Sequence, residues 1–163
     1  MRAAQRGDRD AFGRLYVSFS RYVHSILLSR LPPAEAADLL QDVFLQAFER
    51  LSSLREPEAF AGWIAAIARH RATDFLRSRM TTVEFNHDPG TGPTAEWNAD
   101  ASVALRAIHP LPDAYRETLT LRLVEGLTGP EIAAVTGLTP ASVRVNLHRG
   151  MKLLRDALGL RHE

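Results

Sequence analysis

Apolar residues recur along the first half of the chain at the i, i+3, i+4, i+7 spacing of amphipathic helices. The first stripe, between residues 10 and 31, comprises Phe12, Leu15, Tyr16, Phe19, Tyr22, Val23, Ile26 and Leu27. Pro32 and Pro33 end it, because proline cannot continue a helix. A second stripe, from about residue 34, comprises Leu39, Leu40, Val43, Phe44, Ala47, Phe48 and Leu51, and a third, reaching about residue 79, comprises Phe60, Trp63, Ile64, Ile67 and Ala68. These stripes predict an N-terminal bundle of three or four helices with one small core.

The helical pattern fails between about residues 80 and 101. Residues 86–93 are dense in Asn, Asp, Gly and Pro, which break regular structure. The segment is also acidic, with Glu84, Asp88, Glu96 and Asp100. We therefore predict a flexible linker over residues 81–104 that separates two domains.

Helix signals return in the C-terminal part. A helix is predicted over about residues 112–125, with Gly126 placed to cap its end. Residues 128–131 then have the Thr-x-x-Glu form of a capping box, which predicts a helix beginning at Gly129. Gly137 permits a left-handed turn, and Thr139 with Pro140 can start another helix. Helix, glycine turn and helix are the parts of a helix-turn-helix, so the predicted fold is all-α.

The last helix divides into an apolar and a basic side. Its apolar side carries Val143, Leu147, Gly150, Leu154 and Leu158, and no acidic residue occurs between Ala141 and Arg155. The second helix of a helix-turn-helix enters the major groove with its N-terminal residues toward base edges. Arg144 and Asn146 would then lie nearest the bases, and Arg149 and Lys152 nearest the phosphates. The alternative is an ordinary solvated basic face.

Composition limits the remaining classes. The chain has 163 residues, a net charge of +1 and no cysteine, which excludes disulfides, thiolate metal sites and a cysteine nucleophile. It lacks a long apolar run and a signal-peptide pattern, so we expect a cytoplasmic protein without membrane insertion. His70 and Asp74 could place two ligands on one helical face, but no third ligand, phosphate loop or activated nucleophile accompanies them. We therefore expect no enzyme activity, metal, cofactor or small-molecule substrate.

Three segments resemble one known family. Residues 138–150, Leu-Thr-Pro-Ala-Ser-Val-Arg-Val-Asn-Leu-His-Arg-Gly, resemble the promoter-binding helix of extracytoplasmic-function sigma factors of RNA polymerase. Residues 37–45 resemble the helix by which that family binds the polymerase clamp, and residues 60–69 resemble its next helix. The order and spacing of the three segments agree over nearly the whole chain.

The resemblance implies a division of labour between the domains. Residues 1–80 would bind core polymerase and the minus-ten promoter element, and residues 105–163 the minus-thirty-five element. The implied polymerase-binding residues are Asp38, Gln41, Asp42 and Leu45. The loop 52–60 and the following helix would hold the unpaired strand, with Arg69, His70, Arg71, Asp74 and Arg77 as minus-ten contacts. The minus-thirty-five contacts would be Ser142, Arg144, Asn146, His148, Arg149 and Lys152.

The resemblance also implies core RNA polymerase, promoter DNA and an anti-sigma factor as partners. Three positions depart from the family pattern: His70 replaces a common Asn, Asn146 a frequent Arg, and Met151 follows Gly150 where Ala-Arg is usual. The promoter sequence is therefore not inherited from the family. Two alternatives are a sigma mimic that only sequesters an anti-sigma factor, and a helix-turn-helix repressor. The clamp-like helix argues against the repressor, and the retained Gln41, Asp42, Arg149 and Lys152 against the mimic.

Overall fold

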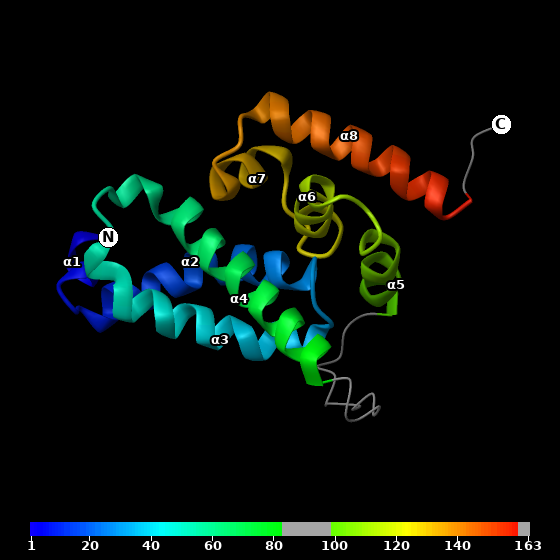
Figure 1. Ribbon diagram of the computed structural model, residues 1–163. Coiled ribbons are helices and arrows are strands. Elements are labelled where there is room, and N and C mark those ends of the chain that lie inside the picture. The colour runs from blue at the N-terminus through cyan, green and yellow to red at the C-terminus, as the bar shows by residue number, and fades with distance from the viewer. Residues whose placement is uncertain (83–98, 160–163) are drawn as a thin grey trace.

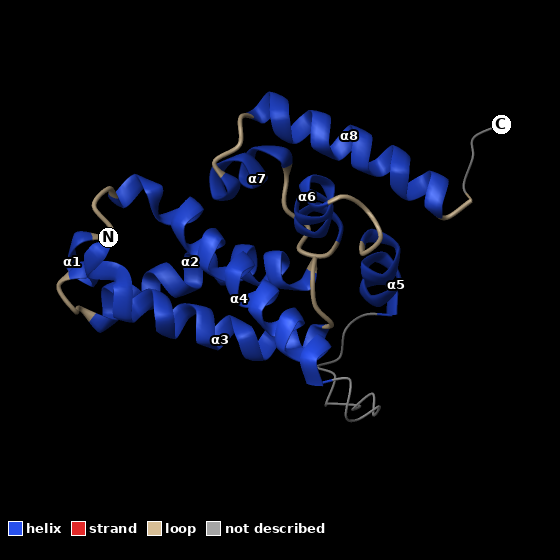
Figure 2. Cartoon of the chain, in the orientation of Figure 1, coloured by secondary structure: helices blue, strands red, loops and turns tan. Residues whose placement is uncertain are grey.

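The computed structural model describes residues 1–82 and 99–159, and all regular elements within these ranges are helices (Figures 1 and 2). The N-terminal half holds α1 (Arg2–Gln5), α2 (Arg9–Leu28), α3 (Pro33–Arg50) and α4 (Phe60–Thr82). The C-terminal half holds α5 (Ala99–Ile108), α6 (Asp113–Leu123), α7 (Gly129–Thr136) and α8 (Pro140–Ala157). The predicted all-α class is confirmed.

Local side-chain chemistry sets the first helix boundaries. The Asp8 side chain accepts a hydrogen bond from the Ala11 amide at 2.9 Å, which caps α2. That helix ends at Leu28, and Pro33 occupies the first turn of α3, where a missing N–H costs nothing. Two 3-10 turns, Leu51–Ser53 and Pro57–Ala59, form the predicted connection before α4.

The N-terminal bundle buries the predicted apolar stripes between α2, α3 and α4. Tyr22, Ile26, Val43, Phe44 and Ile64 are at most 3% exposed. Burying a large apolar side chain contributes about 1.5–3 kcal/mol, so these stripes supply the main stabilising term. The short helix α1, which the sequence pattern did not predict, fastens the connection to the bundle: the Gln5 amide donates to the Leu54 carbonyl at 2.6 Å.

The C-terminal half is built on the contact between α6 and α8. Leu119 and Ile108 are fully buried there, and Gly150 of α8 faces Leu119 and Tyr115 of α6. Helix α5 begins at Ala99, so its residues 99–104 lie in the segment predicted as linker. Only Leu105 and Ile108 of its described side chains are buried, so the helix offers too short an apolar pattern for prediction. Residues 83–98 of the predicted linker lie outside the described residues.

Both halves pack against each other. Helix α6 lies against α2, and α7 lies against α2 and α4 (Figure 1). Leu105, Leu121, Ile132 and Val143 belong to the same buried cluster as the N-terminal core. Helix α8 lies on the far side of α6, at the opposite edge of the molecule from α3 (Figure 1).

Candidate functional site

The predicted polymerase-binding residues lie together on one exposed face of α3. Residues 39, 43, 44 and 47 turn into the core, which leaves Asp38, Gln41, Asp42 and Leu45 on the solvent side. Leu45 is 61% exposed, which is unusual for a large apolar side chain in an amphipathic helix. Helix α3 therefore presents apolar Leu45 to solvent beside the polar side chains of Asp38, Gln41 and Asp42.

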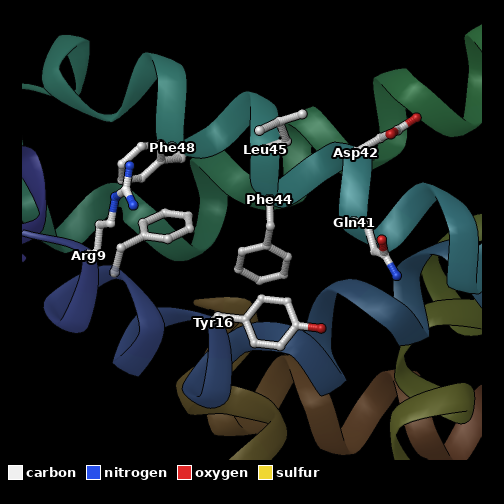
Figure 3. A pocket seen from close by; sticks show the side chains of 8 residues that line it. Arg9, Tyr16, Gln41, Asp42, Phe44, Leu45 and Phe48 are labelled. Atoms are coloured by element: carbon white, nitrogen blue, oxygen red, sulfur yellow. The ribbon is translucent and has the colours of Figure 1, made fainter. Parts of the chain in front are cut away.

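A groove of about 560 Å³ runs beside these residues, between α2 and α3. Figure 3 shows Arg9 and Phe48 at one end, Gln41 and Asp42 at the other, and the rings of Tyr16 and Phe44 between them. The Tyr16 and Phe44 ring centroids are 4.7 Å apart in an edge-to-face arrangement, and Tyr16 is 39% exposed. An apolar floor with charged ends fits an amphipathic segment of a partner protein.

The groove residues on α2 were not predicted to belong to a binding site. Phe12 and Tyr16 were assigned to the core stripe, and no role was given to Arg9. The helical pattern cannot show which apolar side chains remain partly accessible at the seam between two helices. The apolar stripe predicted for residues 10–31 is wider than one packed helix can cover. That excess width was the available sign that some of its side chains stay accessible.

Asp42 connects this surface with the predicted minus-ten helix. Its carboxylate accepts a hydrogen bond from Nη2 of Arg71 in α4 at 3.0 Å. The Nε atom of Arg71 is buried without a hydrogen-bond partner. The pair joins one predicted polymerase contact and one predicted DNA contact, so substitution of Asp42 alone would disturb both surfaces.

The other predicted minus-ten residues differ in accessibility. His70 Nε2 lies 3.3 Å from Asp74 Oδ2 one helical turn away, and both side chains are solvent-accessible. Arg77 is also exposed. The Arg69 guanidinium instead donates to both carboxylate oxygens of Glu117 in α6, at 2.9 and 2.8 Å. The ion pairs of His70, Arg71 and Asp74 among residues 1–82 and 99–159 stay within the N-terminal half, whereas Arg69 is engaged across the interface.

Trp63 packs within the bundle, as predicted from its place in the apolar stripe. Its ring centroid is 5.9 Å from that of Phe60, and the side chain is half-buried against the main core. Buried Leu51 and Phe60 anchor the two ends of the loop that the resemblance assigns to the unpaired strand.

The helix-turn-helix forms as the sequence predicted. Glu131 and Thr128 make a capping box. The Glu131 carboxylate accepts hydrogen bonds from the Thr128 hydroxyl at 2.6 Å and from the Thr128 amide at 2.7 Å, and these bonds lower the pKa of Glu131. Gly137 ends α7 with φ +72°, a conformation that favours glycine. Thr139 then caps α8, where its side chain accepts from the Ser142 amide at 3.1 Å.

The exposed side of α8 carries most of the predicted minus-thirty-five contacts. Val143, Gly150 and Leu154 are buried, whereas Ser142, Arg144, His148, Arg149 and Lys152 are exposed. Asn146 is half-buried, closer to the packed side than predicted. Leu158, placed on the apolar side by pattern, is 48% exposed because the helix ends at Ala157. Val145, 44% exposed among the basic residues, was missed, and its side chain suits contact with a thymine methyl group.

In residues 1–82 and 99–159, no three His, Asp or Glu side chains gather where a metal ion would need them. Within the same ranges, no helix has both the length and the apolar character to cross a bilayer.

Comparisons with known proteins match both halves of the chain to one family. Residues 15–82 match the family model for Sigma-70 region 2, and residues 103–154 match that for Sigma-70, region 4. The ECF RNA polymerase sigma-E factor of Escherichia coli is 28% identical over 92% of this chain and 87% of its own length. A probable RNA polymerase sigma factor, RfaY of Xanthomonas campestris, is 30% identical over 95% of this chain, which spans only 42% of that relative.

Solved structures agree on the fold. The sigma factor RpoE from Bartonella quintana, crystallised with the anti-sigma factor NepR, matches with a TM-score of 0.60 and 19% identity over 93% of this chain and 99% of that chain. CnrH, in complex with the cytosolic domain of CnrY, matches with a TM-score of 0.57 and 23% identity over 98% of this chain and 94% of that chain. With both sigma-70 regions matched in order, the chain belongs to the sigma-70 family, in its extracytoplasmic-function group.

Proposed function

We propose that this chain binds core RNA polymerase and directs it to promoters. The observation that carries the proposal is the pairing, in one chain, of sigma-70 region 2 with an exposed clamp-like face and sigma-70 region 4 with a complete helix-turn-helix. The family is not an enzyme family, and the chemistry of RNA synthesis belongs to the polymerase. Core polymerase and chromosomal promoters are in the cytoplasm, so the proposed function places the chain there.

The polymerase would bind the face of α3 together with the neighbouring groove. Leu45 and the rings of Tyr16 and Phe44 offer apolar contact, and Gln41 and Asp42 offer polar contacts beside it. A central apolar anchor surrounded by polar groups is the usual composition of an energetic hot spot. The partner segment is therefore expected to insert an apolar side chain between α2 and α3.

Promoter DNA would be bound at two places. The basic side of α8 supports binding of duplex DNA in the major groove, where Arg144 faces bases and Lys152 faces phosphates. The exposed side chains of α4, including His70 and Arg77, support binding of the separated strand of the minus-ten element. An anti-sigma factor is proposed as a further partner because the structural relative RpoE was solved in complex with the anti-sigma factor NepR.

Run-off transcription with purified core polymerase and fragmented genomic DNA tests the proposal. We expect discrete transcripts that depend on the added chain. Leu45→Arg should lower polymerase affinity by about tenfold or more, because it places a charge at the centre of the contact. Glu49→Ala, on the same helix but outside the groove, should change affinity less than about twofold.

A polymerase affinity that is equal for wild type and Leu45→Arg would refute the docking surface. Absence of transcripts combined with intact binding to an anti-sigma factor would favour the sigma-mimic alternative.

A further inference from the structure

Helix α6 lies against α2 (Figure 1) and is joined to α4 through Arg69, one of the predicted minus-ten contacts. At its centre, Arg69 holds Glu117 through two hydrogen bonds of 2.9 and 2.8 Å, one from Nε and one from Nη2. Nη2 of Arg30 lies 3.4 Å from the same carboxylate and 2.8 Å from Asp113. Two arginines of the N-terminal half thus hold two acids of α6.

A second group of contacts lies further toward the start of α2. Arg21 Nε donates to Glu125 at 3.0 Å, and His24 Nδ1 lies 3.6 Å from the other oxygen of that carboxylate. The backbone carbonyl of Leu28, between the two groups, lies 3.1 Å from the His109 ring nitrogen. The C-terminal half is therefore attached to the N-terminal half at three places. Two of them, at Arg21 with His24 and at Leu28, are on α2, and the third is formed by Arg30 beyond the end of α2 and Arg69 of α4.

The central contact has features that distinguish it from a surface ion pair. Glu117 is only 13% exposed, and the fork geometry of Arg69 matches both carboxylate oxygens. Hydrogen bonding to Glu117 raises the pKa of Arg69, so its charge is fixed. Buried Tyr22 lies beside the pair, and burial raises the pKa of its hydroxyl to about 12. Water is largely excluded from the Glu117 and Tyr22 side of the contact, which strengthens the attraction there, while the Arg69 side chain itself is 41% exposed.

A carboxylate and a phosphate are bound by arginine in the same way, through two parallel N–H donors. Glu117 therefore occupies the donors of Arg69 that a promoter phosphate would use. The exposed side of α8 is on the opposite side of α6 and is not covered by this contact (Figure 1). The closed arrangement leaves the duplex-reading helix available while it occupies a strand-binding residue.

We infer that the acidic edge of α6, with Glu117 at its centre, is an intramolecular ligand of the N-terminal DNA surface, and that the chain free of polymerase is closed against single-stranded DNA until this contact is released. The DNA part of the inference rests on the proposed role of Arg69 in minus-ten binding. Opening would free Arg69 and Arg30 together, because Glu117 bonds to both.

Closure is tested by distance measurement on the full chain. The protein has no cysteine, so cysteines placed at exposed Glu49 of α3 and Asp156 of α8 can carry two spin labels for pulsed dipolar spectroscopy. The labelled parent should give one narrow distance distribution. Glu117→Gln should add a longer population, with the ratio of open to closed chains raised about tenfold, equivalent to about 1.4 kcal/mol. Arg69→Gln should also add open chains, and the double variant should open no further than Glu117→Gln alone, because Glu117→Gln already weakens the contact with Arg69 together with that to Arg30.

Asp10→Asn is the matched control, because it removes one negative charge from exposed α2 surface without touching α6. Its distance distribution should equal that of the parent. If Glu117→Gln gave the parent's distribution as well, the inference would be overturned.

The DNA part is tested with a random single-stranded oligonucleotide and a random duplex, both fluorescently labelled. Glu117→Gln should bind the single strand at least about fivefold more tightly than the parent, and the gain should disappear in the Arg69→Gln, Glu117→Gln double variant. Duplex affinity should stay within about twofold, because α8 is unchanged. If Glu117→Gln opened the chain but gave no gain in single-strand affinity that depends on Arg69, the inferred competition between Glu117 and DNA for Arg69 would be overturned. Neither readout uses polymerase, so failure of the proposed function would show separately as absence of run-off transcripts.

Discussion

Arg144 and Lys152 both project from the exposed side of α8, two turns apart, but their chemistry predicts different effects on DNA binding. A guanidinium can form two hydrogen bonds with guanine and so discriminate between bases, whereas an ammonium on phosphate only anchors the protein. Arg144→Ala should cost about 1–3 kcal/mol and relax sequence preference, and Lys152→Ala should weaken all sequences alike and reduce the salt slope by about one.

Binding of the full chain to duplexes that vary in the minus-thirty-five element, at several salt concentrations, checks this prediction. Asp156→Asn, on the same helix, provides a control that removes a charge of the opposite sign. An equal loss for every duplex with Arg144→Ala would identify Arg144 as a phosphate contact and place α8 differently in the groove.

At the scale of single helices, most boundaries followed from local signals. The capping box at Thr128, the left-handed Gly137 and the Thr139 cap were all predicted and are confirmed. These features depend on residues within one turn of each other, so a sequence displays them directly. Helices α1 and α5 were not predicted, because four residues and a segment with two described buried side chains are too short to establish a period. Their stability comes from tertiary contacts, which no local pattern contains.

The packing of α8 on α6 makes Gly150 a test of helix–helix contact. A Cβ at this position would lie 3.0 Å from Leu119 Cδ1 and 3.2 Å from Tyr115 Cβ. Alanine favours a helix by about 1 kcal/mol over glycine, but overpacking costs about 1–3 kcal/mol. The Tyr115 Cβ is fixed to the backbone of α6 and cannot move without that helix, so we expect Gly150→Ala to lower the unfolding free energy by about 1 kcal/mol.

Gly13 in α2 provides the matched control, since a Cβ there meets nothing within 4 Å. Gly13→Ala should raise the unfolding free energy by up to about 1 kcal/mol through helix propensity alone. Urea denaturation of both variants and of wild type shows whether each substitution raises or lowers the unfolding free energy. A gain for Gly150→Ala equal to that for Gly13→Ala would mean that α6 and α8 are not tightly packed at this point.

For the whole molecule, the two sigma regions were predictable and their contact was not. Each of the motifs on α3, α4 and α8 is a continuous stretch of sequence. The family comparisons match the first two to Sigma-70 region 2 and the third to Sigma-70, region 4. The roles of individual site residues remain predictions. Glu117 and Glu125 carry no motif, and their partners Arg69 and Arg21 are 48 and 104 residues away. Such pairs arise only when the two halves are placed together, so the engagement of Arg69 was visible only in the structure.

The interface should respond to acid through Glu125. Burial opposes ionisation of this carboxyl group, but hydrogen bonds from His24 and Arg21 and their charges outweigh it and lower its pKa below the ordinary 4.5. A carboxyl whose pKa is lowered on folding stabilises the folded state above its unfolded pKa, and this contribution is lost as the pH falls through the folded value. Wild type should therefore have a larger unfolding free energy than Glu125→Gln at neutral pH, and the difference should shrink toward zero below about pH 4.

Urea denaturation of wild type and Glu125→Gln between neutral pH and about pH 4 measures the difference in their unfolding free energies. Carboxyl groups that both proteins share contribute equally and drop out of this difference. His24→Gln in both backgrounds removes the imidazole contact, so that the remaining difference belongs to Glu125 opposite Arg21. Glu49→Gln, an exposed residue of α3 away from α6, should leave the unfolding free energy nearly unchanged. A difference between wild type and Glu125→Gln that stayed constant from neutral to acid pH would mean that Glu125 packs against α2 without acting as a charge, and that the ionic attachment of the C-terminal half depends on Glu117 and Asp113 alone.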